Sequence, residues 1–126
     1  MKIPLYSCYL LSDDSKAKLL ELFVPKFDKI FAHHITTEFG ENSKLPIIPK
    51  TIEVIGYSSN HGIEALVVSI DDNTYRPDGS IYHITWSLNP SEYSPVDSNK
   101  LLCENGYTML DTPTLIKVEP KLFYRQ

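Results

Sequence analysis

Two histidine–threonine motifs are the parts of this chain whose residue types and spacing could do chemistry. They are His34-Ile35-Thr36 and His83-Ile84-Thr85, each within a short run of apolar and β-branched residues. Alternate side chains of a strand share one face, so each motif presents an imidazole beside a hydroxyl. Two such units facing each other would supply a proton acceptor, a proton donor and two hydroxyls for phosphate oxygens. Histidine suits both proton-transfer roles because its unperturbed pKa of about 6.5 lies near neutral pH.

One His-x-Thr motif alone is weak evidence, because threonine favours strands whatever their function. A second copy makes the evidence stronger, since it has the same middle residue, lies in the same kind of predicted strand and is distant in the sequence. We therefore predict that His34, Thr36, His83 and Thr85 are the catalytic residues of a metal-independent phosphodiesterase.

The elements that must position these motifs follow from periodicity and turn signals. A strand over 3–11 would carry Tyr6 and Tyr9 on opposite faces, and a helix would follow the Ser12 start signal. The remaining elements are a strand over 28–39 with the first motif, a loop over 40–50, a hairpin of strands over 51–58 and 64–70, a turn over 71–80, a strand over 81–88 with the second motif, a short helix over 99–104 and β-like runs within 107–123, such as 115–118.

Alternation assigns faces within the two motif strands. In the first, the face with Phe31, His33 and Phe39 should point inward, which leaves His34, Thr36 and Glu38 toward a cleft and makes His33 a packed or backbone-bonded histidine. In the second, the face with Tyr82, Ile84 and Trp86 alternates with His83, Thr85 and Ser87. His61 lies in a turn, where a solvent-exposed histidine is expected.

Length and composition indicate a single domain over residues 1–126, large enough to fold without disulfides. Cys8 and Cys103 form no metal-ligand pattern, so we expect two buried thiols in a reducing cytoplasm. The N-terminus is a poor secretory signal, and no apolar run reaches the length of a membrane span. These features predict a cytoplasmic protein.

The charge balance bears on the ligand. Twelve basic and sixteen acidic residues give a formal net charge of −4, which argues against binding of duplex DNA by bulk electrostatics. A small or short phosphate ligand, held locally, is the better expectation.

With both motifs in place, the sequence resembles the 2H phosphoesterase superfamily, the LigT-like enzymes with paired His-x-Thr/Ser motifs. His83-Ile84-Thr85-Trp86 followed by the segment 95–99 is also similar to a branch that includes RNA-ligase-associated phosphodiesterases and phage anti-CBASS nucleases. The resemblance implies an α+β, two-lobed fold of antiparallel strands around a central cleft, with a few helices outside. It implies that His34 and His83 are the acid–base pair and that Thr36 and Thr85 hold the phosphate, with no cofactor or metal.

The implied function is cleavage of cyclic nucleotides or cyclic oligonucleotide signals, in the host cytoplasm if the protein is of phage origin. A 2',3'-cyclic phosphodiesterase or a ligase acting on RNA ends is an alternative from the same resemblance. Candidate substrate-binding residues are Tyr9 and Trp86 for base stacking and Arg76 for a second phosphate, with Lys100 as another cation.

Two further alternatives belong to other classes. A cupin-like metal protein would use His33, His34, Glu38 and His83 as ligands, although adjacent histidines of a strand point to opposite faces. A nucleotide-binding module without turnover would use the same cleft. Activity that survives EDTA, and product analysis with cyclic nucleotides, separate these possibilities.

Overall fold

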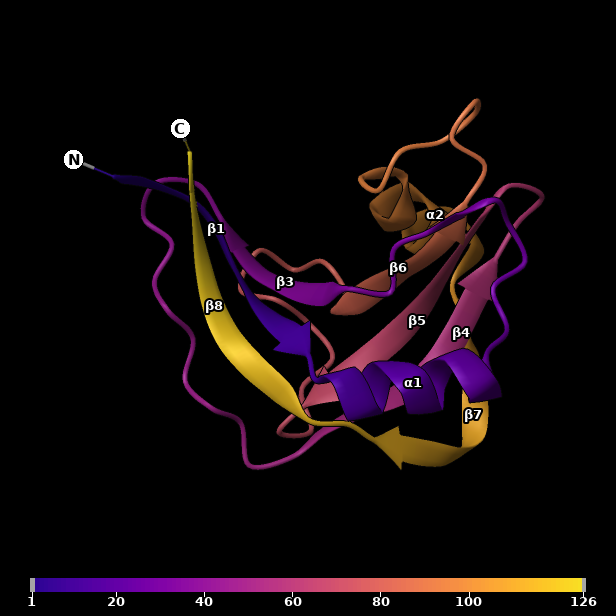
Figure 1. Ribbon diagram of the computed structural model, residues 1–126, viewed down its shortest axis with the longest axis horizontal. Helices are drawn as coiled ribbons and strands as arrows, with labels where there is room; N and C mark the ends of the chain where they lie inside the picture. Colours follow the sequence, from indigo (N-terminus) through magenta and orange to yellow (C-terminus); the bar gives the residue numbers. More distant parts are fainter. Residues whose placement is uncertain (1, 126) are drawn as a thin grey trace.

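The computed structural model describes residues 2–125 as an α+β chain of two antiparallel sheets and two helices (Figure 1). In chain order the elements are β1 (Ile3–Leu11), α1 (Asp13–Leu22), β2 (Lys29–Ile30), β3 (His34–Phe39), β4 (Ile52–Ser59), β5 (Ile63–Ile70), β6 (His83–Leu88), α2 (Asp97–Asn105), β7 (Thr108–Leu115) and β8 (Val118–Arg125). No helix in residues 2–125 is long and apolar enough to cross a membrane.

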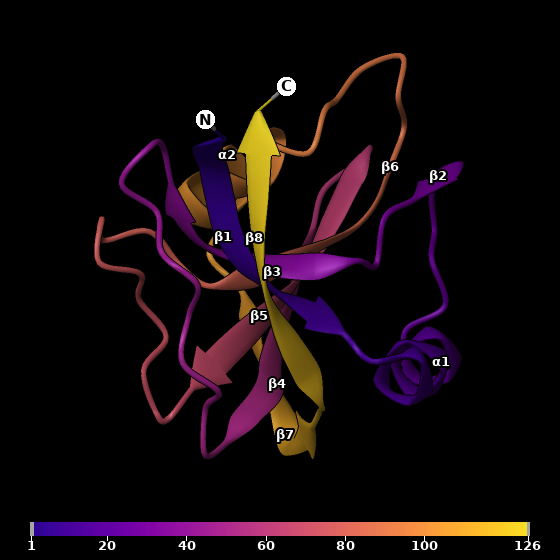
Figure 2. The ribbon, with the colours of Figure 1, turned by 60° about the vertical axis from the view of Figure 1, so that its left-hand side comes forward.

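The two motif strands belong to different sheets. The smaller sheet has the strand order β3-β1-β8, and the larger has the order β2-β6-β5-β4-β7. Each hydrogen-bonded strand pair is antiparallel. The first and last strands, β1 and β8, therefore lie side by side in the smaller sheet (Figure 2). The first His-x-Thr motif lies on β3 and the second on β6, so the two sheets must approach each other to form one site.

The main hydrophobic core joins the sheets to α1. The apolar faces of β4, β5 and β6 meet Tyr9 of β1, Ile35 of β3 and Leu19 of α1. The strand β5 is buried at every position because the core covers one face, while Ala65 packs with Leu101 of α2 on the other. This burial on both faces explains why β5 reads as an almost continuous apolar run.

The helix α1 begins where its sequence signal predicts. The hydroxyl of Ser12 accepts a hydrogen bond from the Ser15 N–H at 3.1 Å, and Asp13 and Asp14 occupy the first turn. Acidic residues in that position interact favourably with the helix dipole. Likewise, the predicted hairpin is confirmed, since β4 and β5 pair over the predicted ranges.

The prediction of one strand over 28–39 is wrong. The segment divides into β2, which pairs with β6, and β3, which pairs with β1. Ala32, between them, adopts a φ of 45°, and the chain passes there from one sheet to the other. In the sequence, the pattern on which the alternation was based runs through 31–39 without interruption, so it could not reveal that the hydrogen-bonding partner changes.

Two smaller expectations are also corrected. Residues 116 and 117 form the connection between β7 and β8, where Ile116 is buried, so 115–118 is not one strand. Cys8 is buried as expected, but Cys103 is exposed on α2.

Candidate active site

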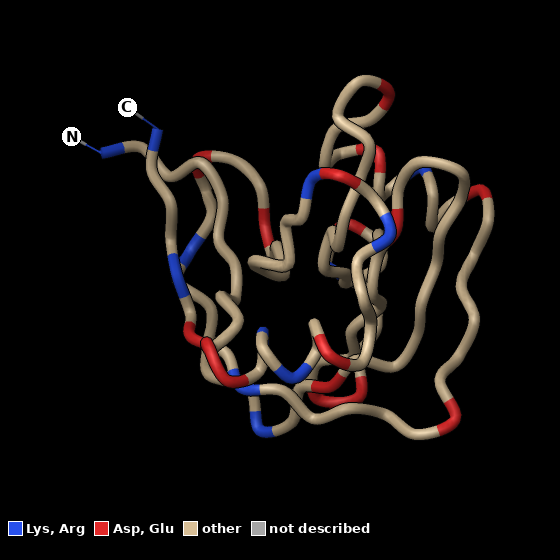
Figure 3. Tube along the Cα trace, turned by 45° about the vertical axis from the view of Figure 1, so that its right-hand side comes forward, with Lys and Arg blue, Asp and Glu red and all other residues tan. Residues whose placement is uncertain are grey.

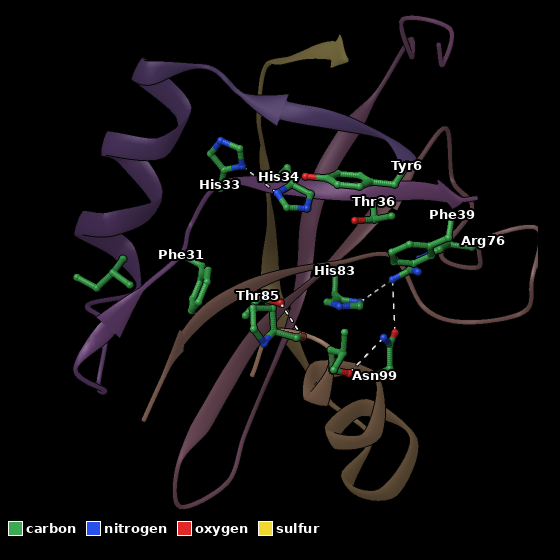
Figure 4. A pocket seen from close by; sticks show the side chains of 13 residues that line it. Tyr6, Phe31, His33, His34, Thr36, Phe39, Arg76, His83, Thr85 and Asn99 are labelled. Carbon is green, nitrogen blue, oxygen red and sulfur yellow. Dashed lines mark hydrogen bonds between the residues drawn. The ribbon is translucent and has the colours of Figure 1, made fainter. Parts of the chain in front are cut away.

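Both His-x-Thr motifs reach a single pocket of about 460 Å³ between β3 and β6 (Figure 4). Its lining includes His34 and Thr36 from β3 and His83 and Thr85 from β6. Residues separated by about fifty positions in the chain are thus brought together by the approach of the two sheets. This is the arrangement that paired acid–base chemistry needs.

The strand β6 holds its motif by anchoring the opposite face. Tyr82, Ile84 and Trp86 belong to the main core, as the alternation predicts. The Trp86 indole N–H also donates to the Phe23 carbonyl oxygen at 2.7 Å. With that face fixed, His83 and Thr85 must project to the pocket side.

The strand β3 contains a bulge that changes which residues face the pocket. Its register against β1 passes from Glu38 opposite Ser7 directly to Thr36 opposite Cys8, so Thr37 is an extra residue. Beyond the bulge the alternation is reversed: Phe39 lines the pocket, while Glu38 is exposed and accepts a hydrogen bond from the Lys44 N–H at 3.4 Å. The expectation that Glu38 faces the cleft and Phe39 the interior is therefore wrong.

His83 is held in one tautomer. Its Nδ1 lies 2.7 Å from the Ile81 carbonyl oxygen, and because a carbonyl oxygen can only accept, Nδ1 carries the proton. The neutral ring is then unprotonated at Nε2. Burial lowers the pKa of His83 to about 4, the Ile81 hydrogen bond opposes this shift, and the positive charge of Arg76 adds to it.

His34 lies across the pocket between two rings. Its Nδ1 is 2.9 Å from Nδ1 of His33, and its ring stacks on Tyr6 with the centroids 5.4 Å apart. Burial, followed by the charges of His33 and Arg76, lowers the pKa of His34 to about 4. Both imidazoles are therefore predominantly neutral at pH 7 in the free protein.

Arg76 is a buried cation that faces this pocket. It is 5% exposed, its guanidinium carbon lies 5.4 Å from the centre of the Phe39 ring, and its Nη2 is 3.5 Å from Asn99 Oδ1. Its Nε has no hydrogen-bond partner, and among residues 2–125 no carboxylate forms an ion pair with it. Nη2 also lies 3.3 Å from His83 Nδ1, but that nitrogen is already a donor. Since arginine stays charged in proteins, its unused donors favour an anion in the pocket.

The threonine hydroxyl of the second motif links the site to α2. Thr85 Oγ1 is 2.9 Å from Ser98 Oγ and 3.4 Å from the Pro95 carbonyl oxygen. These contacts bring Val96 and Asn99 to the pocket edge. In the other motif, Thr36 is 9% exposed and lines the same pocket.

Two of the three candidate substrate-binding residues lie elsewhere. Tyr9 and Trp86 belong to the main core, and the Tyr9 hydroxyl donates to the Ile47 carbonyl oxygen. Both point away from the pocket because they occupy the core-facing sides of β1 and β6. Arg76 does line the pocket, whereas Lys100 is exposed and pairs with Glu104 at 3.8 Å.

The pocket residues that sequence reasoning missed are mostly apolar. Tyr6 occupies the pocket side of β1, and Ile30, Phe39 and Val96 are more than half exposed at its edge. The alternation placed Tyr6 and Tyr9 on opposite faces of β1, but it did not show which of these faces lines the pocket. Exposed apolar side chains beside polar ones are typical of a binding site.

The metal-site alternative required His33, His34, Glu38 and His83 to converge. Glu38 points out of the pocket, and within residues 2–125 no three or more His, Cys, Asp or Glu side chains are grouped to hold a metal ion. His33 precedes β3 and so escapes the strand alternation. It is exposed and bonded to His34, not packed inside as expected.

The burial of Trp86 gives a first testable prediction. Trp86→Phe should lower the free energy of unfolding by about 1–3 kcal/mol, because it removes buried volume and leaves the Phe23 carbonyl oxygen unpaired. Urea denaturation measures this change. A change confined to ligand affinity, with unaltered stability, would contradict the assignment of Trp86 to the core.

The lowered histidine pKa values predict how stability depends on pH. The unfolded chain binds protons at its histidines below about pH 6.5, whereas folded His34 and His83 bind them only near pH 4. Stability should therefore fall between pH 6.5 and 4. His83→Asn, which keeps a donor for Ile81, should reduce that loss by on the order of 2 kcal/mol. Parallel urea titrations of both proteins cancel the common contribution of carboxylates, and identical pH dependence would contradict the prediction.

No family model, curated protein or solved structure matches this chain.

Proposed function

We propose that this protein is a 2H-type, metal-independent phosphodiesterase that cleaves cyclic nucleotides or cyclic oligonucleotide signals. One observation carries the proposal: two His-x-Thr motifs, on strands of separate sheets, line one pocket together with Arg76, a buried cation that has no carboxylate partner in residues 2–125. Each sheet contributing one motif strand to a shared cleft is also what a two-lobed 2H fold would require.

The tautomer of His83 assigns it the role of proton acceptor. With its Nδ1 proton engaged by the Ile81 carbonyl oxygen, Nε2 is free to take a proton from water or from a ribose 2'-hydroxyl. His34, on the other side of the pocket, then protonates the leaving oxygen. Its second ring nitrogen points away from His33 and into the pocket (Figure 4).

The phosphate itself would be held by the remaining polar groups. Hydroxyls of Thr36 and Thr85 would donate hydrogen bonds to the non-bridging oxygens, and the unused donors of the Arg76 cation would stabilise the negative charge that develops on them. A bound phosphodiester would also raise the proton affinity of the nearby imidazoles, because its negative charge favours their protonated form. Substrate binding thus helps to create the protonated histidine that the reaction uses.

The shape of the pocket favours a small nucleotide ligand. Its volume of about 460 Å³ falls within the usual range for small-molecule sites. Phe39, which is more than half exposed, offers an aromatic ring for a base, and Ile30 and Val96 offer apolar edges. Acidic and basic residues are interspersed along the described chain (Figure 3), and the formal net charge is −4, so a long nucleic acid duplex is not the proposed partner. The proposed location is the cytoplasm, that of the host if the protein comes from a phage.

The proposal is tested by incubating the protein, with EDTA present, with 2',3'-cyclic mononucleotides and separately with cyclic di- and trinucleotides. Chromatography then identifies linear products. Turnover of the cyclic oligonucleotides supports the proposed substrate class, whereas exclusive opening of 2',3'-cyclic phosphates indicates the RNA-end alternative. Binding without product, at any pH between 5 and 8, would indicate a module that only sequesters nucleotides.

A further inference from the structure

We propose that His33 is a positioning residue that supplies protons to His34 through a direct Nδ1–Nδ1 hydrogen bond. In this arrangement His33 donates its Nδ1 proton to His34 Nδ1 as His34 releases its Nε2 proton to the leaving oxygen. The inference rests on the proposed phosphodiesterase function and extends it to a third histidine.

The geometry places His33 where such a relay would have to be. The two Nδ1 atoms are 2.9 Å apart, and the rings meet edge to face at 5.1 Å between centroids. Because the hydrogen bond occupies Nδ1 of His34, Nε2 is the nitrogen that faces the pocket (Figure 4). His33 itself is exposed, so its ring can exchange protons with solvent.

The backbone before β3 makes this contact possible. Adjacent residues of a regular strand point to opposite faces, but His33 precedes β3 and follows Ala32, whose φ is 45°. The His33 carbonyl oxygen accepts a hydrogen bond from the Leu11 N–H at 3.1 Å. The chain passes from one sheet to the other at Ala32, which interrupts the alternation of side chains. The hydrogen bond from Leu11 then fixes the backbone position of His33.

The other ionisable groups around His34 explain why a relay would be useful. They are Tyr6 on β1, His83 on β6 and Arg76 from the loop before β6. Burial of the ring, followed by the charges of His33 and Arg76, lowers the pKa of His34 and so disfavours an imidazolium there. The exposed ring of His33 is one proton transfer away from His34, across the 2.9 Å between the two Nδ1 atoms.

In the proposed step the nucleophilic oxygen gives its proton to His83 Nε2 and bonds to phosphorus, while the bond from phosphorus to the departing oxygen breaks. Protonated His33 loses its Nδ1 proton and becomes neutral, His34 changes from the Nε2–H to the Nδ1–H tautomer, and the departing oxygen becomes a hydroxyl. After the product leaves, His83 releases its Nε2 proton to solvent and a solvent proton adds to His34 Nε2. His34 then returns its Nδ1 proton to His33, which restores the starting state.

Three variants test the relay, with His61→Ala as the matched control at another exposed histidine. His33→Ala should lower kcat by about 10- to 100-fold with KM within about twofold, since general acid–base terms are of this order or larger. His33→Asn can still donate to His34 Nδ1 but cannot titrate, so its kcat should stay low. His33→Asp can only accept, so it should also be impaired. If His33→Asn recovers wild-type kcat, His33 merely orients His34 and the relay is wrong.

Two readouts separate a relay from a structural effect. Added imidazole should restore kcat of His33→Ala at least severalfold while leaving the wild type and His61→Ala unchanged. In the free wild-type protein, ¹⁵N NMR of the His34 ring near neutral pH should show the proton on Nε2. A proton found on Nδ1, or the absence of imidazole rescue, would overturn the relay.

The same series distinguishes this inference from the proposed function. A wild type that cleaves no cyclic nucleotide overturns both. A wild type that turns over substrate, with His33→Ala equally active, overturns the relay alone.

Discussion

Replacement of His83 or His34 by alanine should lower kcat by about 10²–10⁴-fold in each case, because each variant loses one of the two proposed proton transfers. The double variant should be little worse than either single one, since in the proposed mechanism the two imidazoles act in one concerted step. Rates are measured under single-turnover conditions with the cyclic nucleotide that the wild type cleaves. His61→Ala, whose ring lies in an exposed turn, is the control and should retain full activity.

Folding must be separated from chemistry in these variants. His83 is 7% exposed, so its truncation leaves a small cavity. His83→Asn provides the second measurement, because its amide can still donate to the Ile81 carbonyl oxygen while no proton acceptor remains at the Nε2 position. Either histidine variant turning over substrate near the wild-type rate, with normal urea unfolding, would remove that histidine from the mechanism.

Replacement of Arg76 by methionine should reduce activity and increase stability together. Loss of its charged hydrogen bonds to the phosphate should lower kcat/KM by about 10- to 100-fold, since such bonds are worth about 1.5–3 kcal/mol. At the same time the free energy of unfolding should rise by about 1–3 kcal/mol, because the variant removes a buried charge that forms no ion pair with its carboxylate neighbour Asp78, and methionine fills similar volume.

The matched control for Arg76 is Lys100→Met. Lys100 is an exposed cation near the start of α2 that pairs with Glu104, and surface pairs of this kind contribute little. That variant should change neither activity nor stability appreciably. Loss of stability in Arg76→Met would show that Arg76 has structural partners that offset its burial, and the argument for an anion at this site would lose its basis.

The buried arginine and the two imidazoles that would bind the phosphate are expected to lower the free energy of unfolding of the ligand-free protein. The pocket holds a buried arginine and two imidazoles whose pKa values are lowered to about 4. The arginine cation disfavours a positive charge on either imidazole, and an anionic phosphodiester would favour the charged form of all three groups. Ligand binding should therefore stabilise the fold, as expected when a ligand binds only the native state.

The sequence alone determined the local elements and the faces of β6. The Ser12 cap, the hairpin and the alternation around Trp86 depend on neighbouring residues, and local patterns report such interactions directly. The two His-x-Thr motifs were readable for the same reason, because a strand places residues two apart on one face.

Only the tertiary structure decided what surrounds those motifs. The segment 28–39 is divided between two sheets. The bulge at Thr37 places Phe39, and not Glu38, in the pocket. Tyr6, and not Tyr9, lies beside His34. Arg76 reaches His83 from the loop before β6, and His33 reaches His34 from the break before β3. These outcomes depend on which strand supplies the hydrogen-bond partners and on how two sheets meet. Such long-range contacts leave no periodic signal in the sequence of either partner.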